Sequence, residues 1–142
     1  MNGSLLNDDN GNDRAEKLVD AVLSKFSLVM GVSLVNSNAD LLGGKVRPGY
    51  EQKFARQQSL GTNMWGSWYS LLLSIAGKMD DYGEKVEFLT IWREGYKTIL
   101  VPIFSEGAII SLAVDSSVDS HAIVSKLKLF LKESLPSERA KG

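Results

Sequence analysis

Three short apolar segments follow one another closely in the second half of the chain. They cover residues 86–92, 98–104 and 108–114, and each is rich in the β-branched and aromatic side chains that favour strands. The breaks between them contain Gly95 and Gly107 and are only a few residues long. Because parallel neighbours need a much longer crossover, the pattern predicts three consecutive antiparallel strands.

Apolar residues recur at steps of three and four in three other segments, which is the period of a helix with one buried face. The first segment begins at Asp13, whose side chain can cap a helix. The second extends over residues 50–79 without a proline, and the last begins at Ser116-Ser117 and ends before Pro136. We therefore expect two helices of ordinary length and one long central helix.

Residues 28–35 and 41–46 are predicted to form a hairpin around the polar turn 36–40. Gly43-Gly44 in its second strand indicates a bulge or a close approach of another backbone. Pro102 cannot donate to a strand ladder, so we expect it at a bulge or near a strand end.

Several strands are apolar at consecutive positions, so both faces of the sheet must be covered. We therefore predict an α/β fold, arranged as an α+β three-layer sandwich. Its five-stranded antiparallel sheet lies between the long helix and the two terminal helices. The elements follow in the order helix-strand-strand-helix-strand-strand-strand-helix.

The length of 142 residues fits one domain, which we place at residues 13–135. Residues 1–12 are polar and contain too little apolar surface to offset the entropy of ordering them. We expect flexible tails at 1–12 and at 136–142.

Composition and charge exclude several classes of function. The formal net charge is -1, from acidic and basic residues spread along the chain, so no basic field is available to hold nucleic acid. The absence of cysteine excludes disulfides, thiolate metal ligands and thiol nucleophiles. Neither a leader pattern nor an apolar run of membrane-spanning length occurs, so we expect a cytoplasmic protein without membrane insertion.

The order of elements over residues 14–135 resembles the roadblock / dynein light chain family, which has a profilin-like fold. Local echoes are the Gly-Val-Ser-Leu-Val strand at 31–35, the Leu-Leu-Gly-Gly sequence at 41–44 and Gly107 before the final strand. Residues 41–49, followed by a long helix, are similar to an archaeal group with roadblock-like architecture.

This resemblance implies a homodimer in which the long helix pairs with its mate and the third strand extends the sheet across the two-fold axis. It also implies a regulatory or scaffold role, since many roadblock domains bind or regulate small Ras-like GTPases. Enzymatic activity and a cofactor are not expected.

The long helix carries apolar residues around a wide arc, and the third strand is apolar as well. One interpretation is an unusually wide core face, and another is a dimer or partner interface, because large exposed apolar patches usually mark contacts. An aromatic cage for a ligand is the third alternative. The interface residues predicted on this basis are Met64, Trp65, Trp68, Tyr69, Leu72, Phe88, Leu89 and Ile91.

Candidate catalytic groups are few. His121, the only histidine, falls near Asp115, Asp119 and Ser120, but no nucleophile elbow or second histidine accompanies them. Arg93 is expected at a solvated hairpin tip. The alternative hypothesis is that this arginine acts on a GTPase partner. We predict no catalytic, metal or cofactor site. The alternative function is a small-molecule-sensing domain of a signalling system, since related folds hold ligands between helix and sheet.

Overall fold

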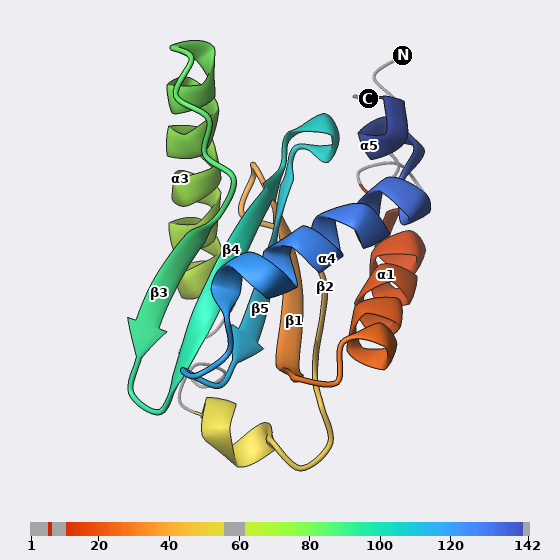
Figure 1. Cartoon of the computed structure of the whole chain (residues 1–142), viewed down its shortest axis with the longest axis vertical. Coiled ribbons are helices and arrows are strands. Elements are labelled where there is room, and N and C mark those ends of the chain that lie inside the picture. The colour runs from red at the N-terminus through yellow and green to blue at the C-terminus, as the bar shows by residue number, and fades with distance from the viewer. Residues whose placement is uncertain (1–5, 7–10, 56–61, 141–142) are drawn as a thin grey trace.

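The five predicted strands form one antiparallel sheet in the order β2-β1-β5-β4-β3 (Figure 1). The computed structural model describes Leu6 and residues 11–55 and 62–140. Strands β2 and β3 are the two edges of the sheet, and β3, β4 and β5 follow one another as the expected meander. The strands are β1 (Val29–Asn36), β2 (Leu41–Val46), β3 (Leu89–Arg93), β4 (Tyr96–Ile103) and β5 (Ala108–Val114).

Helices cover both faces of this sheet. Helices α1 (Gly11–Lys25) and α4 (Ser120–Ser134) pack on one face, and α3 (Thr62–Asp81) packs on the other. A short C-terminal helix, α5 (Pro136–Ala140), follows α4, and the described residues also include two single turns of 3-10 helix, η1 (Glu51–Phe54) and η2 (Phe104–Glu106). The three-layer sandwich and the order of its main elements confirm the prediction from sequence.

The two faces of the sheet support cores of unequal size. On the α1 and α4 face, apolar side chains of these two helices and of the sheet form the larger cluster, with Leu34, Ile110 and Leu127 inaccessible to solvent. Under α3 the cluster is smaller and aromatic, built on Trp65 and Tyr69. Seven of the eight residues of β1 are buried, which is the consecutive burial expected of a strand with both faces covered.

Both expectations for Gly43-Gly44 are confirmed. The register between β1 and β2 shifts opposite Leu34 and Val35, and Leu42 is the additional residue of the resulting bulge. A Cβ at Gly43 would lie 3.2 Å from the carbonyl carbon and oxygen of Ala15, so glycine lets α1 approach the strand closely. Pro102 is the penultimate residue of β4, which confirms its predicted place near a strand end.

The long helix is shorter than predicted. Part of the predicted segment forms η1, and the helix itself begins at Thr62, while residues 56–61 lie outside the described part of the chain. Phe54 does not extend the apolar face of α3; it packs edge-on against Tyr96, with ring centroids 5.1 Å apart. Its helical spacing from the later apolar residues is a coincidence of the pattern.

Both predicted helix caps were wrong. Helix α1 begins two residues before Asp13, which lies in the first turn and forms an ion pair with Lys17 at 3.3 Å. Helix α4 is capped by Asp119, whose carboxylate accepts a hydrogen bond from the Ala122 N–H at 3.2 Å. The third predicted strand also begins later than expected, at Leu89.

The expected tails at 1–12 and 136–142 need correction where the structure describes them. Leu6 is 1% exposed, and its N–H donates to the Glu106 carboxylate at 3.0 Å. In α5, the Ser137 hydroxyl donates to the other oxygen of Glu106. A buried carboxylate is costly without hydrogen-bond donors, and these two donors satisfy Glu106. The two hydrogen bonds connect Leu6 and α5 to η2, of which Glu106 is the last residue. Within the described residues, none of the helices combines the length and the apolar character needed to cross a membrane.

Candidate interaction surface

The inward face of α3 packs against the sheet of its own chain. Trp65, Tyr69 and Leu73 are buried there, four residues apart, and the rings of Trp65 and Tyr69 lie 5.5 Å apart. Trp65 and Tyr69, both predicted interface residues, therefore present little surface to another molecule. The side chain of Met64, also predicted, lies outside the described part of the structure.

A second apolar stripe follows α3 and is open to solvent. Its four side chains are 43–59% exposed, and we call Trp68, Leu71, Ile75 and Met79 the α3 stripe. Of these, Trp68 alone was among the predicted interface residues. Leu71, Ile75 and Met79 lie on an arc of the helix next to the buried arc, and they also recur at steps of three and four residues. This second apolar repeat is the signal in the sequence that could have identified them.

The α3 stripe lies on the side of α3 that faces β3. On the opposite flank, the Ser70 hydroxyl donates to the Ser37 carbonyl in the β1–β2 turn at 2.7 Å, so that flank faces β2. At 3.6 residues per turn, the stripe lies roughly 100–180° around the helix from Ser70. In Figure 1, α3 lies at the edge of the sheet that β3 forms, and α1 lies at the other edge.

The β3 edge continues this surface. Strand β3 pairs with β4 along one side, and no other described strand pairs with its outer side. Leu89 and Ile91 are half-buried on the α3 face, together with Leu72. Phe88 turns to the opposite face and meets the His121 ring edge-on at 5.0 Å, so the structure separates it from the other predicted interface residues.

Trp92 adds an exposed aromatic group near the end of β3, which the predicted set missed. It is 66% exposed, and the Lys97 ammonium lies 4.7 Å from its ring centroid. Trp92 alternates with Leu89 and Ile91 along β3, so its side chain lies on the α4 face of the sheet, as does that of its partner Lys97. Exposed tryptophan side chains are enriched at protein contacts.

Arg93 is not a solvated hairpin tip, which corrects the sequence prediction. Its Nε donates to Thr98 Oγ1 at 2.9 Å and its Nη2 donates to the Tyr69 hydroxyl at 3.1 Å. The guanidinium also lies 5.9 Å from the Tyr96 ring. Burial raises the pKa of the Tyr96 hydroxyl, and the positive charge of Arg93 opposes that shift. Arg93 thus joins β3, β4 and α3 inside the chain.

The groups around His121 do not form a catalytic triad. The imidazole is exposed and contacts Phe88, while the Asp119 carboxylate caps α4. The Asp115 carboxylate accepts from the Ser117 hydroxyl and N–H at 2.5 and 3.0 Å, and these hydrogen bonds lower the pKa of Asp115. Elsewhere in the described residues, no three acidic or histidine side chains converge in a way that could hold a metal ion.

The sequence matches no family model and no curated protein. Solved structures do match. Myxococcus xanthus MglB superposes with a TM-score of 0.63 at 14% identity, over 92% of this chain and 88% of that one. A roadblock/LC7 domain from Streptomyces avermitilis gives a TM-score of 0.59 at 9% identity, over 83% and 92% of the two chains.

The gliding protein MglB of Thermus thermophilus gives a TM-score of 0.56 at 13% identity, over 89% of this chain and 87% of that one. The chain has a roadblock/LC7-type fold. This confirms the fold expected from the resemblance, while the similarity to an archaeal group stays a prediction. In this roadblock/LC7-type fold, α3 is the long helix and β3 is the third strand, so the α3 stripe and the β3 edge belong to the elements that the sequence indicated.

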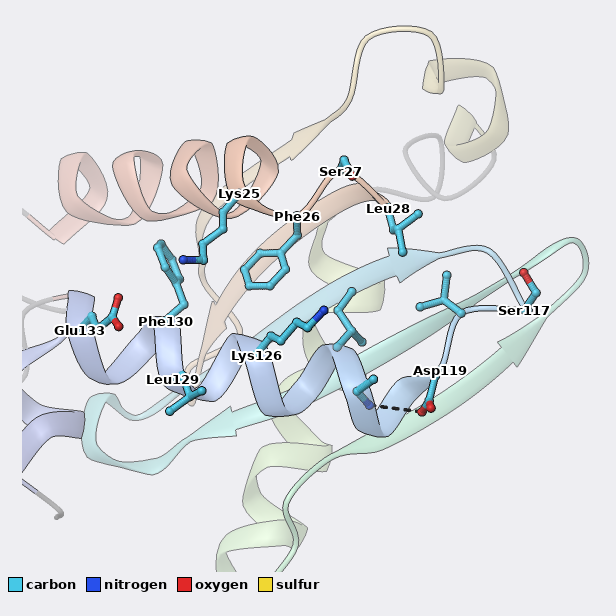
Figure 2. Close-up of a pocket in the computed structure, with 13 residues that line it drawn as sticks. Lys25, Phe26, Ser27, Leu28, Ser117, Asp119, Lys126, Leu129, Phe130 and Glu133 are labelled. Atoms are coloured by element: carbon cyan, nitrogen blue, oxygen red, sulfur yellow. Dashed lines mark hydrogen bonds between the residues drawn. The ribbon is translucent and has the colours of Figure 1, made fainter.

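A concave surface lies on the face of the sheet opposite α3, between the end of α1 and helix α4 (Figure 2). This groove has a volume of about 710 Å³, and its rim includes the exposed Leu28 and Leu129. Lys25, Lys126 and Glu133 are among the residues that line the groove, so charges of both signs are present. The mixture does not single out an anionic or a cationic occupant.

Proposed function

We propose that this chain is a non-enzymatic, homodimeric regulatory or scaffold module that binds a small Ras-like GTPase. The observation that carries the proposal is the position of the solvent-exposed α3 stripe beside the unpaired edge of β3. Because the helix face and the strand edge lie on the same side of the domain, a second copy of the chain can contact both of them at the same time.

The β3 edge is suited to pairing with a second copy. Residues 89–93 contain no proline, and Leu89 and Ile91 alternate on the α3 face. An antiparallel pairing of two β3 strands obeys a two-fold axis, which is the commonest symmetry of homo-oligomers. The same axis brings the two α3 stripes together, so one operation covers the exposed side chains and the open ladder.

The family resemblance supports a GTPase partner, and the roles of the polar groups around His121 support binding rather than catalysis. The groups around His121 serve a cap and a turn, so a role through binding fits the chain better than catalysis. The structural neighbours include one described as MglB with a tetrameric arrangement, at a TM-score of 0.54 and 10% identity over 81% of this chain and 82% of that one. That protein assembles through copies of a similar fold.

The test mixes the full chain with Ras-like GTPases encoded near its gene, each loaded with GDP or with a non-hydrolysable GTP analogue. Complex formation is measured by isothermal titration calorimetry, and GTP hydrolysis is followed in parallel. We expect one GTPase to bind in a nucleotide-dependent manner. If every candidate fails to bind in both nucleotide states, the GTPase assignment is wrong.

A matched pair of variants locates the partner surface. Trp92→Ala removes an exposed aromatic group at the end of β3, and Leu129→Ala removes a similarly exposed group on α4. We expect the first to weaken GTPase binding about tenfold or more, as interface aromatic residues commonly do, and the second to leave it unchanged. Equal effects of both variants would contradict a partner surface beside β3.

A further inference from the structure

We propose that the cavity between the sheet and the N-terminal half of α3 binds a small, neutral heteroaromatic compound. The cavity has a volume of about 290 Å³ and lies on the inner side of α3, separate from the α3 stripe. This volume is near the lower end of the range of roughly 300–1,000 Å³ for small-molecule pockets, which favours a compound of one or two rings.

The floor of the cavity is polar. Three hydroxyl residues from adjacent strands form it: Ser33 in β1, Ser111 in β5 and Thr98 in β4. Ser33 and Ser111 are paired in register, and their Oγ atoms lie 2.5 Å apart. Within such a pair one hydroxyl donates its proton to the other. The hydroxyl that accepts still has its own proton to donate to another acceptor. The floor therefore offers a hydrogen-bond donor beneath α3.

Small residues around the hydroxyls leave the cavity open. Gly31, Gly44 and Ala113 surround the serine pair on the same face. Further along the same strands, toward the C-terminal half of α3, this face is filled by large side chains, among them Leu100 and Ile109. Protein interiors are normally packed to crystal-like density, so space at one end of an otherwise filled layer indicates room for a ligand.

Aromatic side chains form the walls. Phe54 of η1 lies on one side, and Trp65 and Tyr69 of α3 lie above the floor. The Tyr69 hydroxyl accepts a hydrogen bond from Arg93, which fixes the ring in place. Aromatic walls with a few convergent polar atoms are typical of sites for flat organic ligands.

Little charge lies on the described lining. Lys45 is the one charged residue among the described residues that line the cavity, and its ammonium lies 3.1 Å from the Asp20 carboxylate. Behind the lining, the Arg93 guanidinium donates to the Thr98 and Tyr69 hydroxyls, so its positive charge disfavours a cationic ligand. A neutral ring with a nitrogen acceptor matches both the hydroxyl donors and the aromatic walls.

Benzimidazole and indole provide a matched pair of probes, because they share two fused rings and differ in one ring nitrogen that accepts a hydrogen bond. Each is titrated into the full-length protein at pH 7.5, and the amide signals of Ser33, Thr98 and Ser111 are followed by NMR. We expect both compounds to shift these signals. Benzimidazole should bind about fivefold more tightly, which corresponds to one additional hydrogen bond.

Variants test the floor and the space separately. In Ser33→Ala/Ser111→Ala the preference for benzimidazole should disappear while indole still binds. In Ala113→Leu the added side chain should fill the cavity and abolish the binding of both compounds. Ser125→Ala, at an exposed position of α4, is the matched control and should behave like the unaltered protein. Thermal unfolding of each variant verifies that it is folded.

Three outcomes would overturn the proposal. One is the absence of shifts with either compound at several millimolar, and another is shifts that map to the groove between α1 and α4. The third is a fivefold preference that persists in the double serine variant. If Ala113→Leu does not fold, the double serine variant still decides the question, because it leaves the apolar packing intact. None of these results depends on dimerisation or on a GTPase.

Discussion

The proposed dimer makes a quantitative prediction at the centre of the α3 stripe. Leu71 and Ile75 are 59% and 46% exposed, so roughly half of each side chain is left to bury on association. Full burial of a Leu or Ile side chain contributes about 1.5–3 kcal/mol, so completing it in the dimer is worth about 1 kcal/mol for each. A two-fold interface contains four such side chains, and Leu71→Ala/Ile75→Ala should therefore cost about 4 kcal/mol of association free energy.

This loss corresponds to an increase of about a thousandfold in the dimer dissociation constant. Sedimentation velocity over a range of protein concentrations measures that constant directly. The substitutions lie on an exposed flank of α3, so the free energy of unfolding of the isolated chain should change by less than about 0.5 kcal/mol for each. A dimer of micromolar affinity would become a monomer at every concentration that is practical to measure.

Leu129→Ala is the matched control, because Leu129 is 64% exposed but lies on α4, on the opposite face. It should leave the dissociation constant unchanged. The reasoning is refuted if the unaltered chain sediments as a monomer at tens of micromolar. It is refuted equally if the double variant remains as dimeric as the control, because the interface would then have to lie elsewhere.

Three further predictions concern the fold itself. Gly43→Ala should lower the free energy of unfolding by about 1–3 kcal/mol, because its Cβ meets a helix backbone, whereas Gly44→Ala, with ordinary contacts, should cost less than about 1 kcal/mol; chemical denaturation compares the two. Glu106→Ala should cost about 2 kcal/mol in the same assay, because the carboxylate accepts hydrogen bonds from both ends of the chain, and an unchanged midpoint would show that these bonds add nothing. The Asp115 carboxyl should titrate below its ordinary pKa of 3.8, so its contribution to stability is complete above pH 3.8 and is lost as the pH falls through the lower pKa of the folded state. NMR titration of Ser117→Ala should show a higher midpoint for Asp115, and an unchanged midpoint would contradict the hydrogen bonds as the cause.

The sheet was predictable because its signals are local. Each connection of the meander contains a glycine with a positive φ, 85° at Gly95 and 61° at Gly107, and each strand has its own apolar run. The bulge at Gly43 followed from the same kind of signal, since glycine weakens a strand interior and often marks a bulge or a close backbone approach there. Local chemistry and final structure agree at these positions.

Features that depend on distant partners were missed. Arg93 was predicted at a hairpin tip, and the sequence does not reveal that α3 brings the Tyr69 hydroxyl within hydrogen-bond distance of it. The described parts of the two tails are ordered by Glu106, which is 100 residues from Leu6. Composition predicts the entropy of such segments but not the single buried carboxylate that offsets it.

The wide apolar arc of α3 combines both kinds of signal. Trp65 and Tyr69 repeat on one arc, and Trp68 and Leu71 repeat on the next, so periodicity alone cannot decide which arc faces the sheet. In the folded chain the arc of Trp65 and Tyr69 is the buried one, and Ser70 on its other flank donates a hydrogen bond to the β1–β2 turn. A helix that needs only one packing partner can keep its neighbouring arc polar at no cost to the core. That α3 keeps two apolar arcs side by side, with the second beside an unpaired strand edge, is the feature of this sequence that favours contact with another polypeptide.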